Sequence, residues 1–151
     1  MNYYTLFSGT GVGKTELTSI DNALFNSRIA NYNLVKISSI LPPCVTFKKE
    51  IELSEGSILN TAQSSITACA GSKAVSAAVG VAVPEDSAKV GVIMEFSGCC
   101  SVKESEETVK EMLIEAMQIR ESKIKEFKIA SAEITPDGDG YYTAVAGISL
   151  W

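Results

Sequence analysis

The sequence predicts a single layered α+β domain in which most strands pair in antiparallel fashion. Strand-like segments outnumber helical segments by about seven to two when apolar residues are matched to each period. No linker, internal repeat or low-complexity segment divides the 151 residues, and 46% of them are hydrophobic, which is enough to build a core. We therefore expect one domain that spans residues 1–151.

The first predicted strand covers residues 3–7, and a glycine-rich turn follows at 8–15, with the sequence Ser-Gly-Thr-Gly-Val-Gly-Lys-Thr. This turn nearly matches the phosphate-binding pattern G-x-x-x-x-G-K-[ST], but Ser8 stands where the first glycine is needed. A mobile glycine turn is the alternative interpretation, and both remain open.

A first amphipathic helix is predicted over 16–30, with Thr15 or Thr18 as its N-cap. Its apolar face includes Leu17, Ile20, Ala23 and Leu24. Asp21 borders this face, where a carboxylate is more often solvated than part of a site.

An apolar run over residues 34–41 carries the pair Ser38-Ser39 and ends at Pro42-Pro43. By period it predicts a buried strand that finishes in a rigid, extended exit. Buried hydroxyls are costly unless they are hydrogen-bonded. The pair is therefore either a satisfied turn or a group with a chemical task.

The remaining segments predict strands and one long helix. Ser101 or Ser105 begins this helix, and glutamates occupy its first turns. Its apolar residues recur at helical spacing from Val109 to Met117, which is typical of core packing. The predicted strands lie at 45–53, 58–70, 74–83, 89–97, 124–134 and 141–151, with the last two forming a hairpin. The segment 58–70 could instead be irregular, and 74–83 could be a helix, although its valines favour a buried strand.

Glu95 is the only charged residue inside the predicted central strand at 89–97. Such a carboxylate either points into a polar cavity, where its pKa rises, or faces outward from a half-exposed strand. A raised carboxyl pKa suits a proton donor near neutral pH.

The sequence contains no histidine, which excludes Ser-His-Asp and Cys-His hydrolases and every histidine general base. The cysteines Cys44, Cys69, Cys99 and Cys100 lack C-x-x-C spacing, so we expect free thiols and no metal site. A net charge of −5 argues against a nucleic-acid partner. Without a membrane-length apolar segment or a signal-peptide pattern, we expect a cytoplasmic protein with no membrane partner.

Two motifs are more specific: N-L-x-x-I-S-S-I-x-P-P from Asn33 to Pro43, and I-M-E at residues 93–95. Together with Asp21, Leu24 and the stretch 75–84, they resemble the small pyruvoyl-dependent arginine decarboxylases of archaea and some bacteria. The resemblance extends over nearly the whole chain, although 45–69 matches only in length and general pattern. It implies a four-layer α/β/β/α sandwich with mostly antiparallel sheets.

The resemblance implies that the chain cuts itself between Ser38 and Ser39. The Oγ atom of Ser39 would attack the carbonyl of Ser38 and form an ester, with Asn33 in a supporting role. β-Elimination would then release a β chain, 1–38. Hydrolysis of the dehydroalanine left at position 39 would give a covalent pyruvoyl group at the start of an α chain, 39–151. This cofactor would take the place of pyridoxal phosphate, and no metal would be needed.

The implied activity is that of a carbon–carbon lyase, which converts L-arginine to agmatine and CO2 through a Schiff base with the pyruvoyl group. Glu95 would supply the proton, and Asp21 would bind the guanidinium group. Leu24 would line the aliphatic part of the pocket, and Ser38 would contact the substrate. The resemblance also implies a homotrimer or a dimer of trimers with sites between subunits, so Asp21 and Glu95 of one site could belong to different subunits.

Three alternatives remain at this stage. The first is a pyruvoyl decarboxylase of another amino acid, because only Asp21 argues for a guanidinium group. The second is a P-loop-like nucleotide-binding protein. The third is a relative that no longer processes itself and acts as a binding subunit, against which the intact serine pair argues. The physiological role, polyamine synthesis or acid and arginine handling, stays open.

Overall fold

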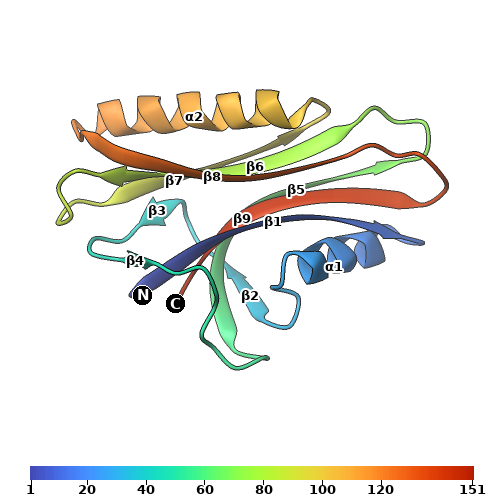
Figure 1. The fold of residues 1–151 in the computed structure, drawn as a ribbon, viewed down its shortest axis with the longest axis horizontal. Helices are drawn as coiled ribbons and strands as arrows, with labels where there is room; N and C mark the ends of the chain where they lie inside the picture. The colour runs from blue at the N-terminus through green and yellow to red at the C-terminus, as the bar shows by residue number, and fades with distance from the viewer.

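The computed structural model describes residues 1–151 and confirms the four-layer α/β/β/α sandwich (Figure 1). Helix α1 covers the outer face of one sheet, which has the strand order β2-β5-β9-β1-β4, and helix α2 covers the outer face of the other, β3-β7-β6-β8. The elements are β1 (Tyr3–Gly13), α1 (Glu16–Asn26), β2 (Asn33–Lys36), β3 (Ile40–Leu41), β4 (Thr46–Phe47), β5 (Ile58–Cys69), β6 (Val75–Pro84), β7 (Gly91–Gly98), α2 (Val102–Ile119), β8 (Ile124–Ile134) and β9 (Tyr141–Leu150).

The main core lies between the two sheets, and it is built from the inward-facing residues of alternating strand positions. On β6 these residues are small or β-branched, and on β9 alanines precede two larger side chains, so the sheets interdigitate closely. The buried members are Tyr4, Leu41, Ala62, Ala77, Val79, Val81, Ile93, Ala144, Ala146, Ile148 and Leu150.

Helix α2 packs on the opposite face of β6 and β7 with the apolar stripe that the sequence predicted. Val109, Leu113 and Met117 are fully buried there. Ser101 is the N-cap, and it forms a reciprocal capping box with Glu104. Neither α2 nor α1 combines the length and the hydropathy that a membrane span requires.

The glycine-rich stretch is part of strand β1, so both the phosphate loop and the mobile turn were wrong predictions for residues 8–13. These residues pair in register with β9 from Ser8 opposite Ala146 to Gly13 opposite Tyr141. A Cβ atom on Gly9 would lie 2.9 Å from the carbonyl oxygen of Ala23, because α1 crosses directly over this strand. The glycines therefore bring the helix backbone into contact with the strand.

Helix α1 begins with Thr15 as its N-cap, as predicted, and ends at Asn26, earlier than predicted. Arg28 adopts a left-handed φ of 62°, which stops the helix. The amide of Arg28 donates to the carbonyl of Phe25 at 2.9 Å, and the amide of Ile29 donates to the carbonyl of Leu24 at 3.1 Å. This is a typical helix-ending arrangement.

The predicted apolar face of α1 is only partly correct. The helix buries the small residues Ser19 and Ala23 against the glycines of β1, while Leu17 is 74% exposed. Because the backbones of α1 and β1 are in contact, there is no room for a leucine side chain between them. The larger apolar side chains therefore lie at the flanks of the helix or face outward.

Three strand predictions need correction. The run 34–41 is not one strand, because β2 belongs to one sheet and β3 to the other. Only Thr46–Phe47 of the segment 45–53 forms a strand. Finally, β9 pairs with β1 and β5 instead of forming a hairpin with β8, which pairs with β6. The connection at residues 135–140 therefore crosses from one sheet to the other.

Gly11 provides a test of the contact between β1 and α1. A Cβ atom there would lie 2.7 Å from the carbonyl carbon of Asn22 and closer still to backbone atoms of Ser19 and Ala23, none of which can rotate away. We expect Gly11→Ala to lower the free energy of unfolding by about 2–3 kcal/mol, the usual cost of overpacking. Urea unfolding measures this cost. The control Ser8→Ala lies on the same strand and removes only a hydroxyl; a loss as large as that of Gly11→Ala would contradict the prediction.

Candidate active site

The serine pair lies where the chain passes from one sheet to the other. The amide of Ile37 still donates to the carbonyl of Thr61 at 3.1 Å, on strand β5 of the first sheet. The carbonyl of Ser39 already accepts from the amide of Ile93 at 3.0 Å, on strand β7 of the second sheet. The peptide bond between Ser38 and Ser39 is therefore held between two anchored residues.

A tight turn centred on Ser39 sets the geometry of this peptide bond. The amide of Ile40 donates to the carbonyl oxygen of Ser38 at 2.8 Å. Because this bond links residues i and i+2 and Ser39 has no positive φ, the turn is an inverse γ-turn. The Ser38 carbonyl oxygen is thus already held by a backbone donor, as a developing oxyanion would require.

Glu95 contacts the serine pair from β7. The Ser39 hydroxyl donates a long hydrogen bond of 3.3 Å to Oε2 of Glu95. Glu95 alternates with the core residue Ile93, so its side chain lies on the inner face of the sheet and is half-buried. Of the two interpretations left open by the sequence, the structure favours the inward-facing carboxylate.

The environment of Glu95 favours its neutral form. Burial raises the pKa of its carboxyl group above the ordinary value of 4.5. The hydrogen bond from Ser39 and the positive charge of Lys36 lower this pKa but do not cancel the effect of burial. Within this chain, the contact between Ser39 and Glu95 thus joins a nucleophile to a carboxyl group with a raised pKa.

Asn33 lies near the start of β2, and its side chain bonds elsewhere. Its Nδ2 atom donates to the carbonyl of Gly56 at 2.6 Å, and its amide donates to the carbonyl of Ser57 at 2.9 Å. The contact that supports the Ser38 carbonyl comes from the amide of Ile40. The role of Asn33 in processing stays a prediction.

Asp21 and Leu24 lie on α1, in the outer layer of the molecule. Asp21 is exposed, and it makes no hydrogen bond or ion pair within this chain. Leu24 is partly buried against the cluster beneath α1. The single chain brings Ser38, Ser39 and Glu95 together but does not bring Asp21 to them.

Two groups at the site were not predicted from the sequence. Lys36 ends β2 and acts on Glu95 through its charge, and the amide of Ile40 holds the Ser38 carbonyl. The position of Lys36 two residues before the serine pair was a weak signal. No side chain could have indicated the contribution of a backbone amide.

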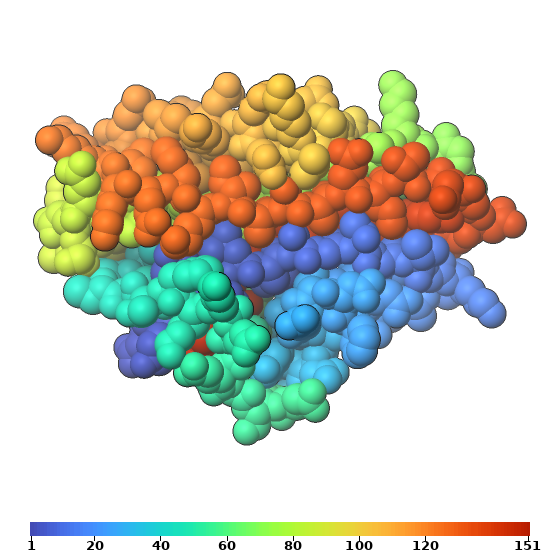
Figure 2. All heavy atoms as spheres, in the orientation of Figure 1, coloured from blue at the N-terminus to red at the C-terminus, as the bar shows by residue number.

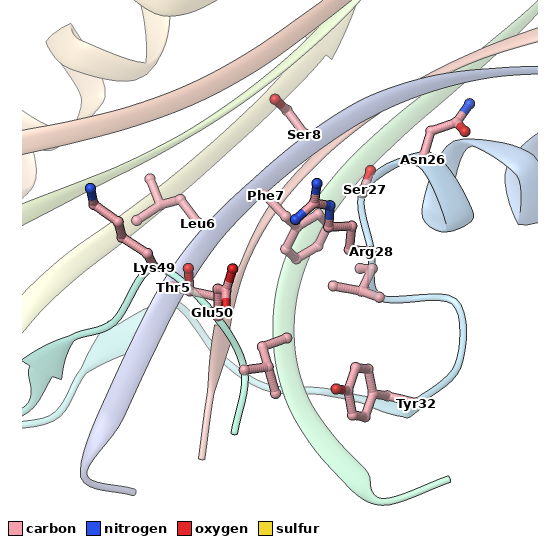
Figure 3. Close-up of a pocket in the computed structure, with 12 residues that line it drawn as sticks. Thr5, Leu6, Phe7, Ser8, Asn26, Ser27, Arg28, Tyr32, Lys49 and Glu50 are labelled. Atoms are coloured by element: carbon pink, nitrogen blue, oxygen red, sulfur yellow. The ribbon is translucent and has the colours of Figure 1, made fainter. Parts of the chain in front are cut away.

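The largest pocket lies elsewhere, with a volume of about 540 Å³. In Figure 2 the blue segment after α1 and the teal-to-green segment before β5 meet below β1, and these segments supply its walls. In Figure 3, Thr5 and Phe7 rise from β1, while Arg28 and Tyr32 approach from one side and Glu50 from the other. None of the predicted site residues lines this pocket, so the serine pair, rather than the largest cavity, is the candidate active site.

Comparison with known proteins shows the family to which the chain belongs. The family model described as pyruvoyl-dependent arginine decarboxylase matches residues 3–151. Proteins named pyruvoyl-dependent arginine decarboxylase are similar over almost the full length. The one from Methanocaldococcus jannaschii is 36% identical over 150 residues, covering 99% of this chain and 90% of the relative. The one from Pyrococcus furiosus is 38% identical over 148 residues, covering 97% and 92%.

A match over nearly all of the chain leaves no part of the fold to a different family. It also agrees with the layered architecture of the fold. The chain belongs to the pyruvoyl-dependent arginine decarboxylase family.

Proposed function

We propose that this protein is a self-processing decarboxylase that converts L-arginine to agmatine and CO2. The observation that carries the proposal is the grouping at the sheet crossing. The Ser39 hydroxyl faces Glu95, and the adjacent Ser38 carbonyl accepts a bond from the Ile40 amide. Membership of the family supplies the reaction class, and these residues supply the local chemistry.

Processing requires only the serine pair and water. The Oγ atom of Ser39 attacks the carbonyl carbon of Ser38, and the Ile40 amide stabilises the oxygen as it becomes negative. The C–N bond breaks, the hydroxyl proton ends on the Ser39 nitrogen, and an ester replaces the amide. Loss of the Ser39 α-proton then expels the Ser38 carboxylate, and water releases ammonia from the dehydroalanine at position 39.

The residues around position 39 fit a pyruvoyl group made in this way. The hydroxyl of the precursor is half-buried, and it lies 3.3 Å from a carboxyl oxygen, so the resulting group would be shielded yet adjacent to a proton donor. A pyruvoyl group at position 39 would supply a carbonyl to bind the substrate amine and an electron sink for the loss of CO2.

Processing also affects Glu95. The hydrogen bond from the Ser39 hydroxyl lowers the pKa of Glu95, and that hydroxyl is consumed when the chain is cut. The remaining influences are burial, which raises this pKa, and Lys36, which lowers it. We therefore expect the pKa of Glu95 to be higher in the mature enzyme than in the precursor. A larger fraction of its carboxyl groups is then protonated and can deliver a proton to the α-carbon.

For substrate recognition, we assign Asp21 to a site formed by two subunits. Asp21 is exposed, and Phe25, one turn further along α1, is 65% exposed. An apolar surface beside an unpartnered carboxylate fits contact with a second copy of the chain, whose serine pair would approach Asp21. A carboxylate can accept both terminal N–H groups of a guanidinium group, which favours arginine over lysine. The proposed assembly is a homotrimer, or a dimer of trimers, and its proposed location is the cytoplasm.

Intact-mass spectrometry under denaturing conditions tests processing. We expect two chains, 1–38 and 39–151, with the larger one gaining two hydrogens after borohydride reduction of its pyruvoyl carbonyl. Ser39→Ala lacks the nucleophile and should give one uncut chain. A parent protein that stays uncut on long incubation would contradict the self-processing proposal.

The pH dependence of kcat tests Glu95 as the proton donor. Because only the protonated carboxyl group can donate, and its pKa is raised above 4.5, kcat should fall as the pH rises through this raised pKa. We expect Glu95→Gln to lower kcat by about a hundredfold or more, the usual contribution of general acid catalysis. Rates are expressed per processed subunit, and Glu85→Gln, an exposed glutamate, serves as the control. An unchanged kcat in Glu95→Gln would remove Glu95 from the mechanism.

Mixed oligomers test whether Asp21 and Glu95 of one site come from different subunits. At arginine concentrations well below KM, Asp21→Asn homo-oligomers should show little activity because they bind arginine weakly, and Glu95→Gln homo-oligomers should show little because they lack the proton donor. Co-expression of the two variants should restore part of the activity, because some sites would combine an intact Asp21 with an intact Glu95. Mixtures no more active than the separate variants would place both residues in one subunit.

A further inference from the structure

We propose that Asn22 and the buried hydroxyl chain Ser19–Thr143–Thr67 are positioning residues that hold the Asp21 carboxylate where it binds the substrate. The inference rests on the proposed role of Asp21 in binding arginine. It concerns how this chain fixes a carboxylate that makes no bond of its own within the subunit.

The first contact joins α1 to the open edge of β1. Strand β9 covers one edge of β1 along its length, but β4 pairs with the other edge only at Tyr3 and Tyr4. The side-chain amides of Asn22 and Asn26 bond to carbonyls beyond that point: Asn22 donates to Val12 at 2.7 Å and Asn26 donates to Thr10 at 2.8 Å. The two asparagines thus take the place of a missing neighbouring strand.

The second contact passes through the buried face of α1. The Ser19 hydroxyl donates to the Glu16 carbonyl at 2.7 Å, and its oxygen lies 2.7 Å from Oγ1 of Thr143. Thr143 in turn lies 2.7 Å from Oγ1 of Thr67. Because the Ser19 proton is used on Glu16, Thr143 donates to Ser19, and Thr67 donates to Thr143. Ser19 and Thr143 are fully buried, so this chain ties α1 to β9 and β5 without water.

Both contacts lie next to Asp21 in sequence. Ser19 precedes it by two positions, and Asn22 follows it directly. On a helix, residues three positions apart lie on the same face, about 60° from each other around the axis. Ser19 is bonded to Thr143 in the interior and Asn22 to the edge of β1, so the two bonds hold this face against the sheet at two separate points and fix the rotation of α1 about its axis. The glycines of β1 fix its distance from the sheet. The location of the Asp21 carboxylate follows from these restraints.

A displaced Asp21 should weaken arginine binding more than it slows chemistry, since Asp21 is proposed to bind the guanidinium group, at the opposite end of the substrate from the reacting α-carbon. We expect Asn22→Ala to raise the KM for arginine about tenfold while kcat changes less than about twofold, because small errors of position are costly. Processing should be complete by intact mass.

Asn26→Ala is the matched control, since it removes the same kind of bond one turn farther from Asp21. We expect a similar decrease in Tm but a much smaller rise in KM. Thr143→Val, which keeps the shape and removes the hydroxyl, should raise KM as Asn22→Ala does, and Thr143→Ser should return KM toward that of the parent.

The outcomes separate this inference from the proposed function. A parent that neither processes nor decarboxylates arginine, or an Asp21→Asn variant with an unchanged KM, would overturn the proposed function and this inference with it. An active parent whose KM rises in Asp21→Asn but not in Asn22→Ala would overturn only the positioning role. Equal KM rises in Asn22→Ala and Asn26→Ala would also overturn it, because they would indicate general loosening of the helix.

Discussion

The geometry of the candidate site depends on one constraint, which is that the chain must pass between two closely packed sheets at Ser38. Stacked sheets lie about 10 Å apart, so about three extended residues are enough to span the gap between them. Ile37 is bonded to one sheet and Ser39 to the other, so neither end of the serine pair can relax. The tight turn at Ser39 is therefore imposed by the packing of the sheets. A reactive peptide bond needs this kind of support from outside itself.

Small residues make that packing possible. Alanines and valines of β6 and β9 let the two sheets interdigitate, and glycines of β1 let α1 approach the backbone of the strand. A larger side chain at these positions would displace a whole layer. Because each layer carries a different part of the site, such a displacement would move these parts relative to one another. Glu95 lies on the inner face of one sheet, Ser38 on the path between sheets, and Asp21 on the outer helix.

Much of this architecture could be predicted from local pattern. The stripe of α2, the strand around Glu95 and the caps Thr15 and Ser101 follow from periodicity and hydrogen-bonding chemistry that act within a few residues. The errors arose where tertiary contacts decide. Glycines typical of a turn became a strand because a helix lies on them, and the last strand joined the other sheet because sheet membership has no local signal.

The site shows the same division. The motif around Ser38 and Ser39 and the isolated carboxylate at Glu95 predicted these residues as the reacting groups, and the structure brings Ser39 and Glu95 into contact. The amide of Ile40 could not be found from side-chain pattern, since every residue except proline carries one. The roles of Ser38, Ser39 and Glu95 stay predictions, as do those of Asp21, Leu24 and Asn33, for which the single chain also shows no contact with the serine pair.

The two ends of the chain lie next to each other, and this affects how the proposed cut relates to the order of the chain. The amides of Asn2 and Tyr3 both donate to the carbonyl of Trp151, so the first and last residues lie side by side (Figure 1). A short linker joining them would make the cleaved protein a circular permutant, one continuous chain running from residue 39 through the junction to residue 38. A gene written in that order would nevertheless not encode the peptide bond between Ser38 and Ser39, so the bond that processing is proposed to cut would never form. The order of the natural chain is thus required by the proposed origin of the cofactor, whereas the closeness of the chain ends would allow another order in the finished fold.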